Sequence, residues 1–94
     1  MELKVVATAG TLESSDIQVI IEPSENGISI ELESTVMAQF GDQIKVVIEE
    51  TLKSLNVTNA KVFANDKGAI DPVIKSRVQT AVYRSCECSE YKWI

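Results

Sequence analysis

Histidine is missing from this chain of 94 residues. Its absence excludes from the chain every catalytic triad or dyad built on an imidazole, and every metal site that uses histidine. The most common general acid or base is missing for the same reason. An enzyme made from this chain alone would depend on carboxylates, lysine, tyrosine or cysteine, so the sequence disfavours a free-standing enzyme.

Cysteine is scarce, with Cys86 and Cys88 as the only two. Two thiols are too few to build a zinc site, and a disulfide at this spacing would be strained. We therefore expect no metal and two reduced thiols in a cytoplasmic protein. Neither thiol is expected to carry an acyl group, because no activating group lies near them in the sequence.

Basic residues and long apolar runs are also few. The chain has nine Lys and Arg and fourteen Asp and Glu, which gives a net charge of −5. A chain of this charge has no electrostatic reason to bind nucleic acid. No stretch approaches the roughly 18 apolar residues of a membrane span, and residues 1–6 are too short and polar for a secretory signal. We expect a cytoplasmic protein, and one domain over residues 1–94.

Three stretches alternate between apolar and polar residues and predict strands. They are residues 3–9, which end at the turn residue Gly10, residues 17–22 and residues 28–33. Residues 23–27 between the last two combine proline with Asn-Gly, which is typical of a turn. This arrangement predicts that 17–22 and 28–33 pair as a hairpin.

An apolar stripe with a period of 3.6 predicts a helix from Thr35 to Leu55. Ser34 or Thr35 is suited to cap its start, and Phe40 falls on the stripe that we expect to be buried. Gly41 costs roughly 1 kcal/mol inside a helix relative to alanine, so a bend or restart is expected there.

A fourth strand is predicted over residues 59–64, followed by a turn at 65–68. A second amphipathic helix should run from residue 70 to about residue 84. Asp71 is suited to be its N-cap, with Pro72 as the first helical residue. The tail from about residue 85 has no clear period, and Tyr91 and Trp93 either pack on the domain or contact a partner.

The order of these elements is β-β-β-α-β-α. Two helices are too few to cover both faces of a sheet, so the sequence predicts an α+β domain of two layers. We expect a mostly antiparallel sheet with two helices on one face. If the third and fourth strands are parallel, the long helix is their crossover and should be right-handed.

Four short segments, in order and at matching spacing, resemble the acyl carrier (gamma) subunit family of citrate lyase. They are residues 9–16 (AGTLESSD), 39–44 (QFGDQI), 48–52 (IEETL) and 66–71 (DKGAID). Each segment is short, but together they extend the resemblance from residue 9 to about residue 83. The tail beyond residue 85 has no counterpart that we identify.

The resemblance implies a non-catalytic carrier subunit with a prosthetic group on Ser14. In the family this group is phosphoribosyl-dephospho-coenzyme A, derived from 2'-(5''-triphosphoribosyl)-3'-dephospho-CoA and bound through a phosphodiester. Its thiol carries acetyl, which the alpha subunit (acyl transferase) exchanges for citryl. The beta subunit (citryl lyase) releases oxaloacetate and restores the acetyl form. A prosthetic-group transferase and an acetylating ligase are further implied partners.

The residues themselves are compatible with a carrier, which needs an accessible hydroxyl rather than catalytic side chains. The polar connection around Ser14 offers one, although Ser15 is equally polar and only one position away. Glu13 and Asp16 are either solvated carboxylates of the turn or guides for a basic partner. Asp66, with the two residues after it, most simply forms the turn before the second helix.

Three alternatives remain open at this stage. The first is the carrier subunit of a malonate decarboxylase, which uses a related arm. The second is a protein-interaction module without a covalent group. The third is an enzyme based on carboxylates or thiols, against which the lack of a catalytic set argues.

Overall fold

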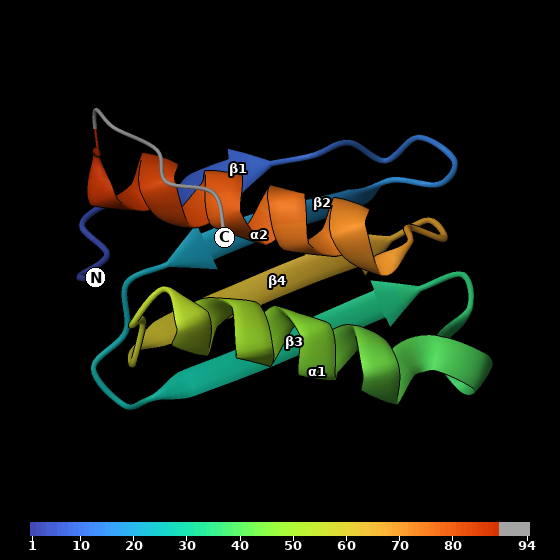
Figure 1. Ribbon diagram of the computed structural model, residues 1–94, viewed down its shortest axis with the longest axis horizontal. Helices are drawn as coiled ribbons and strands as arrows, with labels where there is room; N and C mark the ends of the chain where they lie inside the picture. Colours follow the sequence, from blue (N-terminus) through green and yellow to red (C-terminus); the bar gives the residue numbers. More distant parts are fainter. Residues whose placement is uncertain (89–94) are drawn as a thin grey trace.

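The computed structural model describes residues 1–88, which form four strands and two helices (Figure 1). In chain order they are β1 (Ala7–Ala9), β2 (Ile17–Glu22), β3 (Ile28–Ser34), α1 (Met37–Ser54), β4 (Ala60–Asp66) and α2 (Asp71–Cys86). The order of elements is the one that the sequence predicts. Neither helix in this part of the chain is long and apolar enough to cross a membrane.

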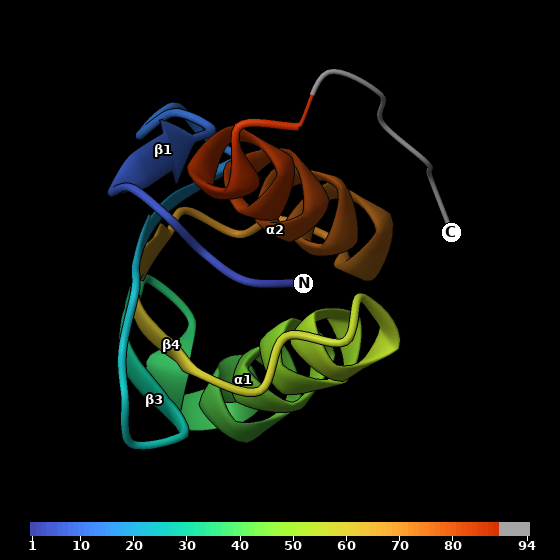
Figure 2. The ribbon, with the colours of Figure 1, turned by 90° about the vertical axis from the view of Figure 1, so that its left-hand side faces the viewer.

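The strands form one sheet in the order β1-β2-β4-β3. The β1–β2 and β2–β4 pairs are antiparallel, whereas β3 and β4 are parallel. Both helices lie on the same face of this sheet, as the end-on view in Figure 2 shows. The α+β class, the mostly antiparallel sheet and the single helical layer are therefore confirmed.

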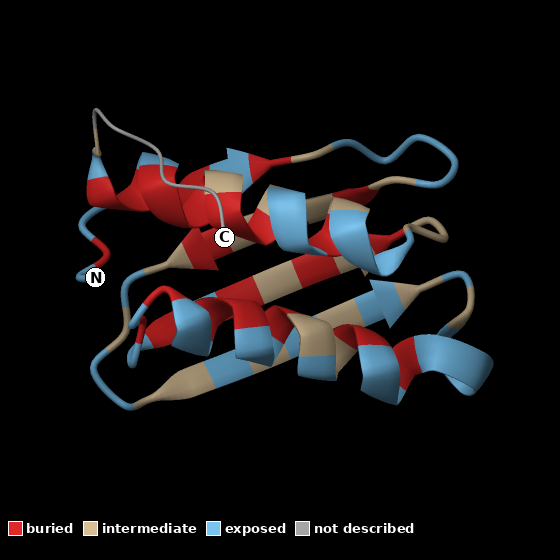
Figure 3. Cartoon of the chain, in the orientation of Figure 1, coloured by how far each residue is buried: buried red, intermediate tan, exposed pale blue. Residues whose placement is uncertain are grey.

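The core fills the space between the helices and the sheet (Figure 3). Alternation in β2 points Ile17, Val19 and Ile21 toward the helices, where all three are completely buried. The two helices contribute Ile44, Ile48, Leu52, Ile74, Val78 and Val82. Each such side chain stabilises the fold by roughly 1.5–3 kcal/mol relative to an exposed position.

The predicted hairpin of residues 17–22 and 28–33 is wrong, because β4 lies between β2 and β3. Gln18 faces Asn65 on one side of β4, and Glu33 faces Asn65 on the other. Residues 23–27 form a turn, but the turn passes over the start of β4, where Gly27 accepts a hydrogen bond from the amide of Ala60 at 3.0 Å. Alternation predicts which face is buried and says nothing about which strand is the neighbour.

The first strand is shorter than predicted and begins at Ala7 rather than at Leu3. Leu3 is buried as its pattern predicts, but the backbone around it pairs with the end of α2 instead of with β2. The amides of Lys4 and Val5 both donate to the carbonyl of Ser85, at 3.0 and 3.1 Å.

Both predicted helix caps are displaced by one or two residues. The N-cap of α1 is Val36, and Ser34 supports this start from outside the helix by accepting a hydrogen bond from the Val36 amide at 3.1 Å. The N-cap of α2 is Ile70, so Asp71 is the first helical residue rather than the cap. A carboxylate in the first turn still interacts favourably with the helix dipole.

The first half of α1 differs from the sequence expectations at two residues, Gly41 and Phe40. The helix continues through Gly41 without a restart, and Gly41 is buried against Met37. Phe40 is not a core residue, because 51% of it is exposed.

A similar difference occurs at the start of α2. Ile70, which the periodicity placed on the buried stripe of the second helix, is 66% exposed.

Three loops gather at one end of the sheet, on the right in Figure 1. They are the β1–β2 connection with Ser14, the β3–α1 connection and the β4–α2 connection. The first and third belong to segments that carry the family resemblance. The parallel pairing of β3 with β4 brings the second loop beside them, because parallel strands end at the same edge of a sheet.

Candidate functional site

Ser14 lies at the tip of the β1–β2 loop, where residues 11–15 are all exposed. Within residues 1–88, the hydroxyls of Ser14 and Ser15 make no hydrogen bond. The two serines differ in their backbones, because Ser15 has a left-handed φ of 67° and its amide is bound by another loop. Ser14 therefore presents a hydroxyl on a loop whose neighbouring backbone is fixed.

The carboxylate of Asp16 fixes the base of this loop. One oxygen, Oδ2, accepts hydrogen bonds from the Thr11 amide at 3.1 Å and from the Thr11 hydroxyl at 2.7 Å. The other, Oδ1, accepts from the Ile17 amide at 2.7 Å. Arg77 on α2 donates to both oxygens, from Nε at 3.0 Å and from Nη2 at 2.9 Å. This bidentate pair ties the loop to α2.

The side chain of Asp16 is 13% exposed and that of Arg77 is 38% exposed, so the pair is only partly open to solvent. The hydrogen bonds from Arg77 hold the pKa of Asp16 well below its usual range against the opposing effect of burial, and smaller contributions from Thr11 and Ile17 also lower it. Asp16 is thus a structural residue. The interpretation of Asp16 as a solvated carboxylate is therefore wrong, and its role as a guide for a partner stays a prediction.

Gly10 allows the loop to leave β1 in this direction. Its φ is +84°, and a Cβ atom there would lie 1.8 Å from the carbonyl oxygen of Ile17 and 3.2 Å from Cδ of Arg77. A side chain would therefore clash with the backbone at the start of β2. The glycine brings the two ends of the loop together.

The β4–α2 loop holds the Ser14 loop from the other side. The Ser15 amide donates to the carbonyl of Lys67 at 2.8 Å, and the Lys67 amide donates to the carbonyl of Asp16 at 2.8 Å. The turn predicted at residues 65–68 is shorter, because β4 continues to Asp66 and the chain turns at residues 67–68. This turn also supports the loop that carries Ser14. Two segments of the family resemblance are joined by these bonds.

Asp66 holds the β3–α1 loop at the same end of the molecule. Its side chain is completely buried, and its oxygens accept hydrogen bonds from the Ser34 hydroxyl at 2.8 Å and from the amides of Gly68 and Ala69 at 3.1 and 2.9 Å. Its own carbonyl accepts from the Thr35 amide at 3.1 Å. One buried carboxylate thus positions both the start of α1 and the backbone before α2.

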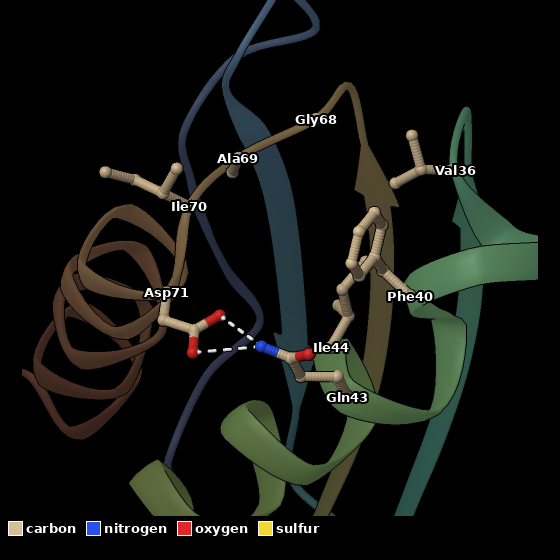
Figure 4. A pocket seen from close by; sticks show the side chains of 8 residues that line it. All are labelled: Val36, Phe40, Gln43, Ile44, Gly68, Ala69, Ile70 and Asp71. Atoms are coloured by element: carbon tan, nitrogen blue, oxygen red, sulfur yellow. Dashed lines mark hydrogen bonds between the residues drawn. The ribbon is translucent and has the colours of Figure 1, made fainter.

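A pocket of about 390 Å³ opens between α1 and the β4–α2 loop. The ring of Phe40 and the carboxamide of Gln43 extend from α1 into the space that faces residues 68–71 (Figure 4). Gln43 Nε2 contacts the Asp71 carboxylate at 3.3 and 3.4 Å. The lining is mostly apolar: Val36, Phe40, Gln43, Ile44, Gly68, Ala69, Ile70 and Asp71.

The two cysteines lie at the opposite end of α2 from this pocket, and both are free thiols. Burial raises the pKa of the Cys86 thiol, which makes it less reactive. Helix α2 extends to Cys86, two residues beyond the predicted end. Tyr91 and Trp93 lie outside the described residues, so their predicted packing or partner contact stays a prediction.

Sequence reasoning missed Arg77 and the buried role of Asp66, including its hydrogen bond from Ser34. One signal was available for Arg77, which stands one helical turn from both Ile74 and Ala81 and so borders the buried face of α2. A charged residue at such a position needs a partner. The sequence offered no way to choose Asp16, which is 61 residues away, as that partner.

Comparison with known proteins gives two kinds of match. Residues 4–85 match the family of acyl carrier proteins (ACP) described as malonate decarboxylase delta subunit (MdcD). The solved structure of a Pseudomonas malonate decarboxylase hetero-tetramer contains a chain with a TM-score of 0.74 at 21% identity, over 89% of this chain and 87% of that chain. A likeness at this identity concerns the fold.

Curated relatives match at higher identity and over nearly the whole chain. The citrate lyase acyl carrier protein of Lactiplantibacillus plantarum is 56% identical over 93 residues, which cover 99% of this chain and 97% of the relative. Those of Streptococcus mutans and Halothermothrix orenii are 54% and 48% identical and cover 92% and 96% of the relatives. This chain therefore belongs to the citrate lyase acyl carrier protein family.

Proposed function

We propose that this chain is the acyl carrier subunit of a citrate lyase, with its prosthetic group bound covalently to Ser14. The observation that carries the proposal is the loop of residues 10–16, whose ends are fixed while the Ser14 hydroxyl stays exposed and unbound by residues 1–88. A modifying enzyme requires such a hydroxyl, and the bound arm requires a stable base.

The backbone favours Ser14 over Ser15 as the attachment site. The amide of Ser15 is bound to Lys67, and its left-handed φ is rare for a residue with a side chain. A transferase that remodels the loop at Ser15 would break this contact. At Ser14, the hydroxyl projects from the turn without that constraint.

The attachment reaction makes one bond and breaks one. The Ser14 oxygen loses its proton and bonds to the phosphorus next to the 5'' carbon of the triphosphoribosyl precursor, and diphosphate leaves. The chain has no histidine that could take the Ser14 proton, so we assign the general base to the transferase. The arm, once bound, supplies a thiol that carries acetyl and citryl groups as thioesters.

The chain then contributes position rather than catalysis. The Asp16–Arg77 pair and the Lys67 carbonyl hold the base of the arm, so the arm acts as a tether between the active sites of the two larger subunits. A tether of this kind raises the effective concentration of the thioester at each site. We propose the alpha and beta subunits of citrate lyase, a prosthetic-group transferase and an acetylating ligase as partners, in the cytoplasm.

Mass spectrometry of the intact protein and its peptides tests this function. The chain is incubated with a citrate lyase prosthetic-group transferase and the triphosphoribosyl-dephospho-CoA precursor. We expect a mass gain equal to phosphoribosyl-dephospho-CoA on the peptide with residues 10–16, retained in Ser15→Ala and lost in Ser14→Ala. An unmodified chain beside a modified control carrier would contradict the proposal and favour an interaction module.

A second assay separates citrate lyase from malonate decarboxylase. The loaded and acetylated protein is added to citrate lyase alpha and beta subunits, or to malonate decarboxylase lacking its carrier. The identity of 48–56% to the citrate lyase carriers leads us to expect oxaloacetate from citrate in the first mixture. Malonate decarboxylation without citrate cleavage would instead support the alternative carrier.

A further inference from the structure

We infer that the pocket between α1 and the β4–α2 loop binds the adenine base of the arm, an inference that rests on the proposed attachment at Ser14. The pocket adjoins the attachment loop. Ser15, the residue after Ser14, bonds to Lys67, and the next residue, Gly68, is already part of the pocket wall. An arm bound to Ser14 therefore begins on a loop beside the pocket, and its adenine base follows after one phosphate and two riboses.

The lining has the groups that a purine base requires. Phe40 offers an aromatic ring in a residue that is 51% exposed, in a position where a core residue was expected. Aromatic rings of this kind stack readily on bases. Gln43 and Asp71 add a carboxamide and a carboxylate at the edge of the same space (Figure 4).

Gln43 and Asp71, which now contact each other, can instead form hydrogen bonds to the base. The bonds from Gln43 Nε2 to Asp71 are 3.3 and 3.4 Å long, beyond the usual range for N–H···O bonds. A glutamine carboxamide can bind both the exocyclic amine and the ring nitrogen N7 of adenine. The Asp71 carboxylate accepts from the same exocyclic amine.

Other parts of the arm fit this pocket less well. The pocket lining contains a carboxylate and no cationic side chain, so it disfavours the diphosphate. Pantetheine lies beyond the diphosphate and has to reach the active sites of other subunits. Adenine is the first flat, uncharged group along the arm, and binding it leaves the thiol end free to move.

Nuclear magnetic resonance of the loaded protein tests the inference. Amide spectra of ¹⁵N-labelled apo and loaded protein are compared, with loading verified by mass. We expect shift differences not only in residues 10–16 but also at Gly68, Ala69 and Ile70 and at the Gln43 carboxamide. Phe40→Ala should lower the docking equilibrium constant by roughly tenfold or more and reduce the differences at the Gln43 carboxamide accordingly.

Two controls identify the occupant. Phe63→Ala removes a ring from the helix-free face of the sheet and should leave the differences unchanged. Hydrolysis of the arm's diphosphate by a pyrophosphatase removes phosphopantetheine and leaves the adenosine phosphate on Ser14. The differences at the pocket should persist after this cleavage. Gln43→Ala provides a second pocket variant, at an exposed position where the fold is not at risk.

Each contrary outcome has a distinct meaning. Loaded protein with differences confined to residues 10–16 would overturn the adenine site and leave the proposed function intact. If the shift differences at the pocket disappear when phosphopantetheine is removed, phosphopantetheine and not adenine occupies the pocket, and the inference is overturned. If they appear only after the larger subunits are added, the pocket binds those subunits, and the inference is likewise overturned. A chain that gains no mass while a control carrier does would contradict the proposed function itself.

Discussion

At the scale of single residues, the site depends on side chains that hold a loop rather than on side chains that react. Asp16 accepts from Thr11, Ile17 and Arg77, and Gly10 lets the backbone pass close to Ile17. The sequence marks Ser14 and Gly10 through their types and positions. It does not mark the Asp16–Arg77 pair, because a contact across 61 residues leaves no local pattern.

Asp16→Asn should destabilise the protein by about 1–3 kcal/mol at neutral pH, because Arg77 loses a charged acceptor. The pKa of Asp16 is lowered in the folded state, so its contribution is complete above the unfolded pKa of about 4 and is lost as pH falls below it. Urea unfolding between pH 2 and pH 7 measures both effects. The stability of Asp16→Asn should depend less on pH in this window than that of the wild type.

The exposed Asp42 on α1 gives a matched control, since Asp42→Asn removes the same charge without an ion pair to Arg77. It should leave the unfolding free energy and its pH profile nearly unchanged. Equal losses in the two variants would show that net charge, and not the Arg77 contact, is responsible.

Gly10→Ala and Gly27→Ala separate backbone strain from a steric clash, because both glycines have a φ of +84°. A Cβ at Gly27 meets nothing within 4 Å, so this change should cost about 1 kcal/mol through strain alone. At Gly10 the clash with Ile17 should add roughly 1–3 kcal/mol. Thermal unfolding of the two variants measures the difference, and similar losses would contradict the tight approach at Gly10.

At the scale of elements, periodicity predicts the buried faces well and fails near helix starts. The β2 side chains Ile17 and Val19 are buried as predicted, and so is Ile48 in the middle of α1. Phe40 fits the same stripe, but it lies in the first turn of α1, where it lines the pocket and remains half-exposed. The apolar pattern begins at the start of the helix, whereas the hydrophobic core covers the helix only from its second turn onward.

Phe40→Ala and Ile48→Ala test this correction within one helix. Ile48 is completely buried, so its truncation should cost about 2–5 kcal/mol through lost burial and a cavity. Phe40 is half-exposed, so its truncation should cost less than about 1 kcal/mol. Denaturant unfolding of both variants gives the comparison. A large loss for Phe40→Ala would show that its ring belongs to the core after all.

At the scale of the whole molecule, the position of β4 determines the arrangement of the site. This strand joins the β1–β2 pair to β3 and ends at Asp66, which contacts Ser34 and the backbone before α2. Had β2 and β3 formed the predicted hairpin, β4 could not bring its last residue between the two neighbouring loops. The Ser14 loop and the pocket share one end of the molecule because of this topology.

Hydrogen exchange followed by nuclear magnetic resonance tests the topology. Amides of β4, such as those of Val62, Phe63 and Ala64, bond alternately to β2 and β3, so all should exchange slowly. In the edge strand β3, alternate amides face away from β4 and should exchange faster. Alternating fast and slow exchange in β4, with uniform protection in β3, would instead support an edge position for β4.

By itself the sequence determined the order of elements, the buried faces except near the helix starts, and the serine-bearing loop, because these follow from local patterns and residue types. Only the tertiary structure decided that β4 inserts between β2 and β3, since alternation fixes a face but not a neighbour. The tertiary structure likewise decided that Asp16 pairs with Arg77 and that Phe40 faces a pocket. Each of these depends on what surrounds a residue in space, which its neighbours in the chain do not specify.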